Sequence, residues 1–202
     1  IVFLDEQTVN LGDINLDRLY AAGLYRGLSL VRHQTFPPEV AQADVIICNK
    51  YPLRAAELKQ LPKLKLVCVA ATGTNHIDLI AHQKSQIAVC NVAAYSTASV
   101  VEHTWQFILA LSHRLIDHHQ SAIDGTWLKS GEFAYLGFPY REVAGKTIGI
   151  IGYGNIGRKM AKIARCFGLN VLIAQLPGRR YSSKPARVKL QQLLARSDFV
   201  CL

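Results

Sequence analysis

Short apolar runs alternate with amphipathic stretches along the whole chain. The apolar runs predict strands at 1–4, 28–32, 44–48, 65–70, 87–92, 147–151, 170–175 and 198–202. The stretches between them have the period typical of helices, as at 15–22, 53–60, 155–167 and 188–196. Near-continuous apolar strands separated by helices favour parallel sheets with helices on both faces. The pattern therefore predicts an α/β fold.

The centre of the chain predicts one long helix over 98–120. Ser99 and Glu102 stand at its start with the spacing of a capping box. The first half of this helix is apolar nearly all round, which favours burial between two bodies over burial on one surface. The glycine-containing stretch that follows, 121–146, predicts an irregular connection.

Two series of strands predict two α/β domains, which we expect at 1–97 and 98–202. The chain starts with Ile1 inside a strand-like run and stops at Leu202 inside another. We therefore expect a fragment in which the second domain is truncated after its first half. We also expect the central strand of that half sheet to expose an unpaired edge.

The charge of the chain is uneven. The net charge is +9, and residues 101–202 hold 14 basic and 6 acidic side chains, against 9 and 8 in residues 1–100. Such a surface fits either nucleic acid or a small anionic ligand. The basic segment 176–196 contains a single aromatic residue, Tyr181. A phosphate-bearing cofactor is therefore the better interpretation, and nucleic-acid binding through this segment is the weaker alternative.

Hydropathy and cysteine usage exclude two further classes. No apolar run reaches the roughly 20 residues of a membrane helix, so we expect no membrane association. The cysteines stand singly, without the CxxC spacing of metal sites, at Cys48, Cys68, Cys90, Cys166 and Cys201. We interpret them as buried, reduced thiols, which favours a cytoplasmic location, and we expect no metal site.

One glycine-rich turn carries the clearest chemistry. Gly152, Gly154 and Gly157 form a GxGxxG pattern between the predicted strand 147–151 and the predicted helix 155–167. In such a βαβ unit the first glycine permits a tight turn, the second lets the backbone approach a diphosphate, and the third lets helix and strand pack closely. N–H groups at the helix start would hold the phosphates. A purely structural turn is the alternative.

The end of the next strand bears on the choice of cofactor. An acidic residue is typical there in NAD-binding units, because it holds the ribose hydroxyls. This chain has Gln175 instead, followed by Arg179 and Arg180, which could pair with a 2′-phosphate. NADP is therefore a candidate cofactor beside NAD. Solvated loop arginines are the alternative.

Four stretches together resemble the D-isomer-specific 2-hydroxyacid dehydrogenases. They are LPKLKLVCVAATGTNHIDL (61–79), IAVCNVAAYSTASVVEHT (87–104), DGTW (124–127) and VAGKTIGIIGYGNIGRKMAKIARCFGLNV (143–171). The ATGTNHID segment is similar to the glycerate dehydrogenase, or hydroxypyruvate reductase, branch. The resemblance implies two Rossmann-like parallel-sheet domains joined by a long helix. The first is a flavodoxin-like substrate domain, and the second binds NAD(P).

The resemblance also implies an activity and a partner. The activity is hydride transfer between NAD or NADP and a small 2-keto or 2-hydroxy acid, such as glyoxylate or hydroxypyruvate. The family leads us to expect a homodimer. The apolar helix 98–120 fits this expectation, although a contact between domains explains that helix equally well.

Substrate binding is implied for residues of the first domain. Thr72 and Gly73 match the turn whose N–H groups receive the substrate carboxylate. Asn49 and Lys50 follow a strand at the same edge of the sheet, where a ligand gathers. Lys50 could attract the carboxylate, and a solvated lysine is the alternative.

Coenzyme binding is implied for a second set of residues. Thr72 and Val100 match coenzyme contacts, and Gln175 takes the ribose position. The diphosphate turn is matched by Tyr153, Asn155 and Ile156, together with the three glycines.

Acid–base catalysis has no candidate in this chain. The family uses an Arg, a His and a Glu, and the resemblance places all three beyond Leu202. His103 and Glu102 point about 100° apart on a helix, so they do not face each other. His118 and His119 present no common metal-binding face. We expect an NAD(P)-dependent D-2-hydroxyacid dehydrogenase whose isolated fragment is inactive; the alternative is a dinucleotide-sensing corepressor of the same architecture.

Overall fold

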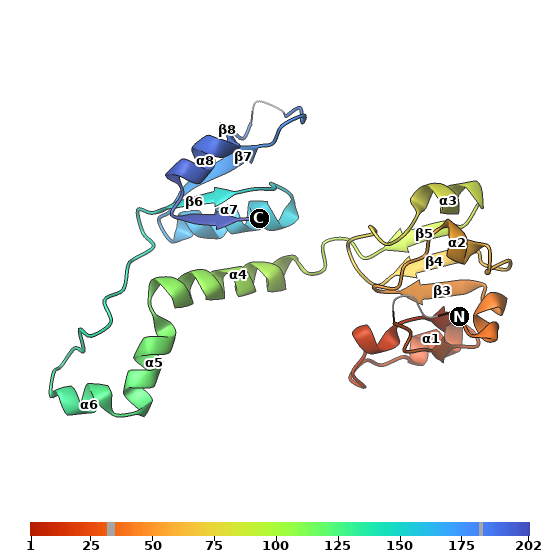
Figure 1. The fold of residues 1–202 in the computed structure, drawn as a ribbon, viewed down its shortest axis with the longest axis horizontal. Helices are drawn as coiled ribbons and strands as arrows, with labels where there is room; N and C mark the ends of the chain where they lie inside the picture. Colours follow the sequence, from red (N-terminus) through yellow and green to blue (C-terminus); the bar gives the residue numbers. More distant parts are fainter. Residues whose placement is uncertain (32–34, 182–183) are drawn as a thin grey trace. The chain divides into compact units, whose positions relative to one another are not determined.

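The computed structural model describes residues 1–31, 35–181 and 184–202. Its contacts divide the chain into two compact units, Ile1–Tyr95 and Ser96–Leu202 (Figure 1). Each unit is built around one parallel sheet, which confirms the predicted α/β class.

The first unit contains a five-stranded sheet in the order β2-β1-β3-β4-β5. Its strands are β1 (Val2–Phe3), β2 (Arg26–Gly27), β3 (Val45–Cys48), β4 (Leu66–Val69) and β5 (Ala88–Asn91). Its helices are α1 (Asp17–Ala22), α2 (Ala55–Leu58) and α3 (Leu79–Lys84), with 3-10 helices at Glu6–Thr8 and Pro38–Gln42. Because the order reverses between β1 and β3, the carboxyl ends of these strands flank the crevice where open α/β sheets bind ligands.

The two faces of this sheet differ in burial. Ile46 and Val67 lie in the core, whereas their neighbours Ile47 and Cys68 on the opposite face are half-buried. The second face is therefore covered only in part, which departs from the expectation of helices on both faces.

The strand predicted at 28–32 forms earlier, at Arg26–Gly27, where it pairs with the two-residue β1. Arg32, at the end of that predicted strand, lies outside the described residues.

The second unit contains a four-stranded sheet in the order β8-β7-β6-β9. Its strands are β6 (Thr147–Ile150), β7 (Asn170–Gln175), β8 (Val188–Lys189) and β9 (Phe199–Cys201). Its helices are α4 (Thr97–Ser112), α5 (Leu115–Ile123), α6 (Thr126–Ser130), α7 (Asn155–Cys166) and α8 (Leu190–Arg196). The central strand β6 pairs with β7 on one side and β9 on the other, so the expected unpaired central edge is wrong.

The core of the second unit forms between α4, α7 and β6. Val101, Trp105 and Ile108 of α4 are buried there, and the Trp105 ring stacks on Phe167 with 4.9 Å between centroids. The opposite face of α4 is open, since Leu111 is 78% exposed. The expected burial of this helix between two bodies stays a prediction, because the second body would lie outside this unit.

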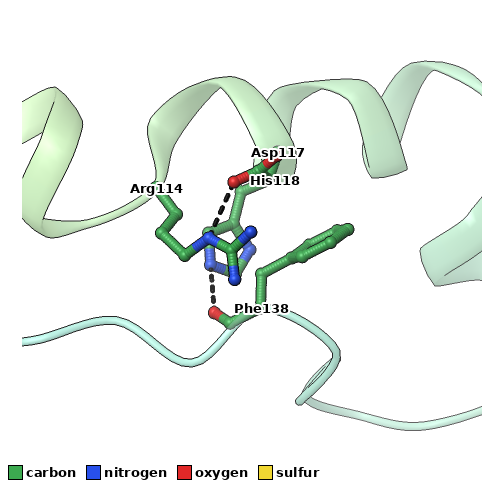
Figure 2. Close-up of polar contacts among 4 residues, drawn as sticks. All are labelled: Arg114, Asp117, His118 and Phe138. Atoms are coloured by element: carbon green, nitrogen blue, oxygen red, sulfur yellow. Dashed lines mark hydrogen bonds and ion pairs between the residues drawn. The ribbon is translucent and has the colours of Figure 1, made fainter.

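The predicted helix 98–120 is two helices, because Arg114 breaks it with a left-handed backbone (φ 50°, ψ 43°). Figure 2 shows the contacts at the break. Arg114 Nε donates to Asp117 Oδ2 at 2.7 Å, and its guanidinium lies 5.1 Å from the centroid of the Phe138 ring. His118 Nε2 donates to the Phe138 carbonyl at 3.0 Å. The segment around Phe138 thus fixes a turn that hydrophobic periodicity does not reveal.

Both ends of the central region also differ from expectation. The hydroxyl of Ser99 donates to the Ser96 carbonyl, so Ser99 does not form the predicted capping box with Glu102. The predicted irregular connection contains α6, a short helix bounded by Gly125 and Gly131 at φ 74° and 69°. Glycine adopts these positive φ values without strain, which allows a short helix to begin and end abruptly.

Candidate functional site

The glycine turn lies at the switch point of the second sheet. It joins the carboxyl end of β6 to α7, and the strand order reverses at β6. Gly152 has φ +102°, which an L side chain rarely adopts. A Cβ on Gly157 would collide with the carbonyl oxygen of Gly152, so glycine is required for the close approach of α7 to β6. Two of the three glycines are thus explained by the turn itself.

Neither the backbone conformation nor a close neighbour requires a glycine at position 154. Its φ of −85° suits any residue, and a Cβ built on it meets nothing within 4 Å. The space next to Gly154 therefore opens directly onto the backbone. A diphosphate fits this cradle, because a bare backbone lets the phosphate oxygens approach the N–H groups.

The start of α7 suits an anion. Gly154 is its N-cap, no side chain caps it, and its first turn contains no acidic residue. The helix dipole and the N–H groups of Asn155 and Ile156 therefore favour negative charge here. Arg158, which sequence reasoning missed, adds a positive charge, and its Nη2 donates to Asn155 Oδ1 at 2.6 Å. The signal was an arginine directly after the last glycine of the motif.

Beside the end of β7, an arginine that was not predicted from the sequence is held by the fold. Gln175 ends β7, and Arg179 and Arg180 lie exposed in the loop beyond it. Arg187 instead donates to the Ala174 carbonyl at 3.1 Å, and its guanidinium lies 4.0 Å from the Tyr181 ring centroid.

The guanidinium of Arg187 also lies 5.7 Å from the ring centroid of Tyr153, in the glycine turn. Its Nε is buried without a hydrogen-bond partner among the described residues. The structure therefore holds one cation between the end of β7 and the turn. In the sequence, nothing distinguishes Arg187 from the other basic residues of 176–196. Residues 182–183 of this segment lie outside the described residues.

Val100 lies on the first turns of α4 and is 39% exposed. Its N–H donates to the Ser96 carbonyl, and its carbonyl accepts from the Thr104 hydroxyl at 2.7 Å. The backbone of Val100 is therefore satisfied within the helix, and only its side chain is free for contact.

In the first unit, β5 braces the Thr72–Gly73 turn. Asn91 Nδ2 donates to the Thr72 carbonyl at 2.8 Å, and Thr72 Oγ1 donates to the Val92 carbonyl at 2.8 Å. A Cβ on Gly73 would point into open space. The turn is thus held from one side and open on the other, as a backbone anion site requires.

Gly73 opens onto a cavity of about 360 Å³. Its lining residues are Lys50, Pro52, Arg54, Gly73, Asn75 and His76. The structure therefore brings together two predicted substrate residues, Lys50 and Gly73, and adds three polar groups that sequence reasoning missed. Two cations and no carboxylate line the cavity, so it favours a small anion.

Asn49, which was also predicted to bind substrate, lies inside the fold and not at the cavity. It is 9% exposed, and its Nδ2 donates to Thr8 Oγ1 at 2.9 Å. Its backbone N–H donates to Asp5 Oδ1 at 2.8 Å. The polar groups of Asn49 are thus engaged inside the fold, and Asn49 does not line the cavity.

Charges and burial shift two groups beside the cavity. Burial lowers the pKa of His76, the charge of Lys50 lowers it further, and Asp5 opposes the change. Burial raises the pKa of Cys48 to about 12, and its Sγ lies 4.0 Å from His76 Nε2. Neutral His76 is therefore favoured in this cavity.

A second cavity of about 380 Å³ lies in the other unit. It is lined by residues that include Lys146 and Asp198, which directly precede β6 and β9. It therefore lies at the amino ends of the strands, opposite the glycine turn, and is not the candidate coenzyme site.

Two histidines of the central region contact aromatic rings. The His103 ring meets Phe107 with 4.5 Å between centroids, and the His113 ring meets Tyr140 at 5.0 Å.

Across the described ranges, no cluster of three His, Cys, Asp or Glu could hold a metal ion. In the same ranges no helix has the length and apolar character of a membrane span.

The family model for "D-isomer specific 2-hydroxyacid dehydrogenase, catalytic domain" matches residues 30–197. The chain belongs to this family. The chain is 37% identical, over 170 residues, to a glycerate dehydrogenase of Methylorubrum extorquens, a match covering 82% of the chain and 52% of the relative. It is 32% identical to a hydroxypyruvate reductase of Blautia hydrogenotrophica, covering 100% of the chain and 64% of the relative.

A solved structure shares the fold of the chain. It is a D-lactate dehydrogenase of Aquifex aeolicus in complex with NAD and lactic acid, with a TM-score of 0.75 and 27% identity, covering 98% of the chain and 59% of that structure. The three matches confirm the resemblance seen in the four sequence stretches. The chain spans 52–64% of the length of these relatives.

Proposed function

We propose that this chain provides the coenzyme and substrate sites of an NAD(P)-dependent oxidoreductase that interconverts a small 2-keto acid and a D-2-hydroxy acid. The observation that carries the proposal is the open cradle at Gly154, beside an α7 terminus with no cap and no acid. Family membership supplies the reaction class. Free cysteines fit the cytoplasmic setting that we also propose.

The coenzyme, NAD or NADP, supplies the hydride or accepts it. The N–H groups that follow Gly154 bind its diphosphate, and Gln175 and Arg187 lie at the ribose end. No carboxylate stands at the end of β7 to repel a 2′-phosphate, and Arg187 is placed to attract one.

The substrate carboxylate binds at the Thr72–Gly73 turn. The side chains of Lys50 and Arg54 add positive charge to the cavity in front of it. We assign the acid–base step to no residue of the chain, and we expect the 202 residues alone to bind ligand without turnover.

Two alternatives are not retained. Tyr181, the single aromatic residue of 176–196, packs against the Arg187 guanidinium at 4.0 Å, so this segment lacks the exposed aromatic rings that favour nucleic-acid binding. The corepressor alternative is favoured by no feature of the two sites, and the relatives named above are enzymes.

We further propose a homodimer that uses the segment 111–140. Large apolar side chains are exposed along it, at Leu111, Leu115, Ile116, Ile123, Leu128, Phe133 and Leu136. Apolar exposure concentrated on one segment marks an interaction surface.

The homodimer is tested by sedimentation equilibrium, which should show a dimer that Leu128→Glu weakens. Leu24→Glu, at a 94% exposed residue of the other unit, should leave it intact; a monomeric wild type would contradict the proposal.

The activity is tested with the whole protein, by following NADH and NADPH oxidation in the presence of glyoxylate and hydroxypyruvate. Lys50→Gln should raise the KM for the keto acid roughly tenfold, since one charge-assisted contact is lost. Lys59→Gln, at an exposed lysine outside the cavity, is the matched control. Absence of oxidation with both acids and both coenzymes would contradict the proposed function.

A further inference from the structure

Two cysteines face each other on neighbouring strands of the first sheet. Cys68 of β4 and Cys90 of β5 are register partners, and their Sγ atoms lie 3.5 Å apart. Neighbouring strands are about 4.8 Å apart, which lies within the Cα separation that a disulfide bridges. The backbone spacing therefore lies within the range that a Cys68–Cys90 bond allows, toward its short end.

The pair lies on the partly covered face of the sheet. Cys90 is exposed and Cys68 is half-buried, whereas Val67 and Val69 point into the core. The other cysteines differ: Cys48 is buried beside His76, and among the described residues neither Cys166 nor Cys201 has a thiol contact like that of the pair. Only Cys68 and Cys90 thus combine a thiol partner with access for an oxidant.

We propose that Cys68 and Cys90 are a modification site, at which a peroxide forms a reversible intramolecular disulfide. Cys90 Sγ attacks one peroxide oxygen, the O–O bond breaks, water leaves, and Cys90 becomes a sulfenic acid. Cys68 Sγ then attacks the Cys90 sulfur, the S–O bond breaks and a second water leaves. Two thiols and one hydrogen peroxide give one disulfide and two waters, and a thiol reductant reverses the bond by exchange.

The environment of the two thiols sets the order of these steps. Burial raises the pKa of the Cys68 thiol to about 11, and the neighbouring Cys90 adds to the rise. Cys68 therefore stays a thiol at neutral pH, so the exposed Cys90 is the group that meets the peroxide first.

The disulfide is coupled to the substrate turn. Asn91 directly follows Cys90 and holds the Thr72 carbonyl, while Thr72 Oγ1 holds the Val92 carbonyl. Bond formation brings the Sγ atoms from 3.5 Å to about 2 Å, and the favoured Cα separation of about 5.5–6 Å is wider than the strand spacing, so β4 and β5 shift at this brace. This second step rests on the proposed function. It predicts a roughly tenfold higher KM for the keto acid after oxidation, with coenzyme affinity unchanged.

The experiment treats the purified protein with equimolar hydrogen peroxide, alkylates free thiols and digests with trypsin. Cleavage after Lys65, Lys84 and Arg114 leaves Cys68 and Cys90 as the single cysteines of peptides 66–84 and 85–114. We expect these two peptides to be joined, and dithiothreitol to release them. Cys166→Ser should retain the link, and Cys68→Ser should leave a sulfenic acid on Cys90 that dimedone traps.

Two outcomes would overturn the inference. Separate alkylation of both peptides after peroxide, or a link through another cysteine, would overturn the modification site. A formed link with an unchanged KM would overturn the coupling. The peptide readout needs no activity, so it stands apart from the proposed function.

Discussion

The buried carboxylate of Asp5 accepts a hydrogen bond from the backbone N–H of Lys50 at 2.6 Å. It also accepts from the N–H groups of Asn49 at 2.8 Å and Tyr51 at 2.9 Å. Asp5 follows β1 and these residues follow β3, so one side chain joins the two strands at the switch point of the first sheet. The N–H groups there are occupied, which leaves the side chain of Lys50 to face the cavity.

Asp5→Asn should lower the free energy of unfolding by about 2–3 kcal/mol. The amide group replaces one accepting oxygen with a donor, which leaves a buried N–H without a partner. Urea denaturation measures the change. Asp13→Asn, at an exposed aspartate, should change the midpoint little; equal effects of the two substitutions would contradict the assigned role.

Acidification should destabilise the first unit through His76. Its pKa is lowered in the folded state, by burial first and by Lys50 second. The unfolded state therefore binds more protons, so this contribution to stability is present above the ordinary value of 6.5 and is lost as the pH falls toward the folded pKa. Histidine NMR titration should show a His76 pKa below 6.5 that rises in Lys50→Gln. A pKa unmoved by this substitution would contradict the geometry of the cavity.

Gly157→Ala should destabilise the second unit by about 1–3 kcal/mol, because the new Cβ collides with the Gly152 carbonyl and α7 must move away from β6. Gly154→Ala should leave the unfolding midpoint unchanged, since its Cβ meets open space. Thermal unfolding of the two variants distinguishes them, and the reverse order of stability would refute the separate roles given to the two glycines.

Arg187→Gln should weaken NADPH binding roughly tenfold more than NADH binding, because only NADPH carries the 2′-phosphate. Arg179→Gln, in the exposed loop, is the matched control and should change both affinities little. Fluorescence titration with each coenzyme measures the ratio. A larger effect of Arg179→Gln would return the 2′-phosphate role to the arginine first predicted from the sequence.

Elements with a strong local signal could be predicted from the sequence. Apolar runs predicted β3, β4, β6 and β7. The helix predicted after the glycine turn, 155–167, starts at the same residue as α7 and ends one residue later. These features depend on neighbours in the chain: alternating burial in a strand, and the φ value that Gly152 requires.

Features that depend on distant contacts could not be predicted. The break at Arg114 requires Phe138, and the engagement of Asn49 requires Asp5, 44 residues earlier. The position of Arg187 at the end of β7 depends on its hydrogen bond to the Ala174 carbonyl. No local pattern encodes these contacts, because each partner alone is an ordinary polar or aromatic residue.

Titration of the whole protein with NADH and NADPH tests the central claim most directly. We expect saturable binding of at least one coenzyme, weakened about tenfold by Gly154→Val in a protein that is still folded. Lys162→Ala, at an exposed lysine of the same helix, should bind as the wild type does. Failure of the wild-type protein to bind either coenzyme, or full affinity in Gly154→Val, would contradict the account.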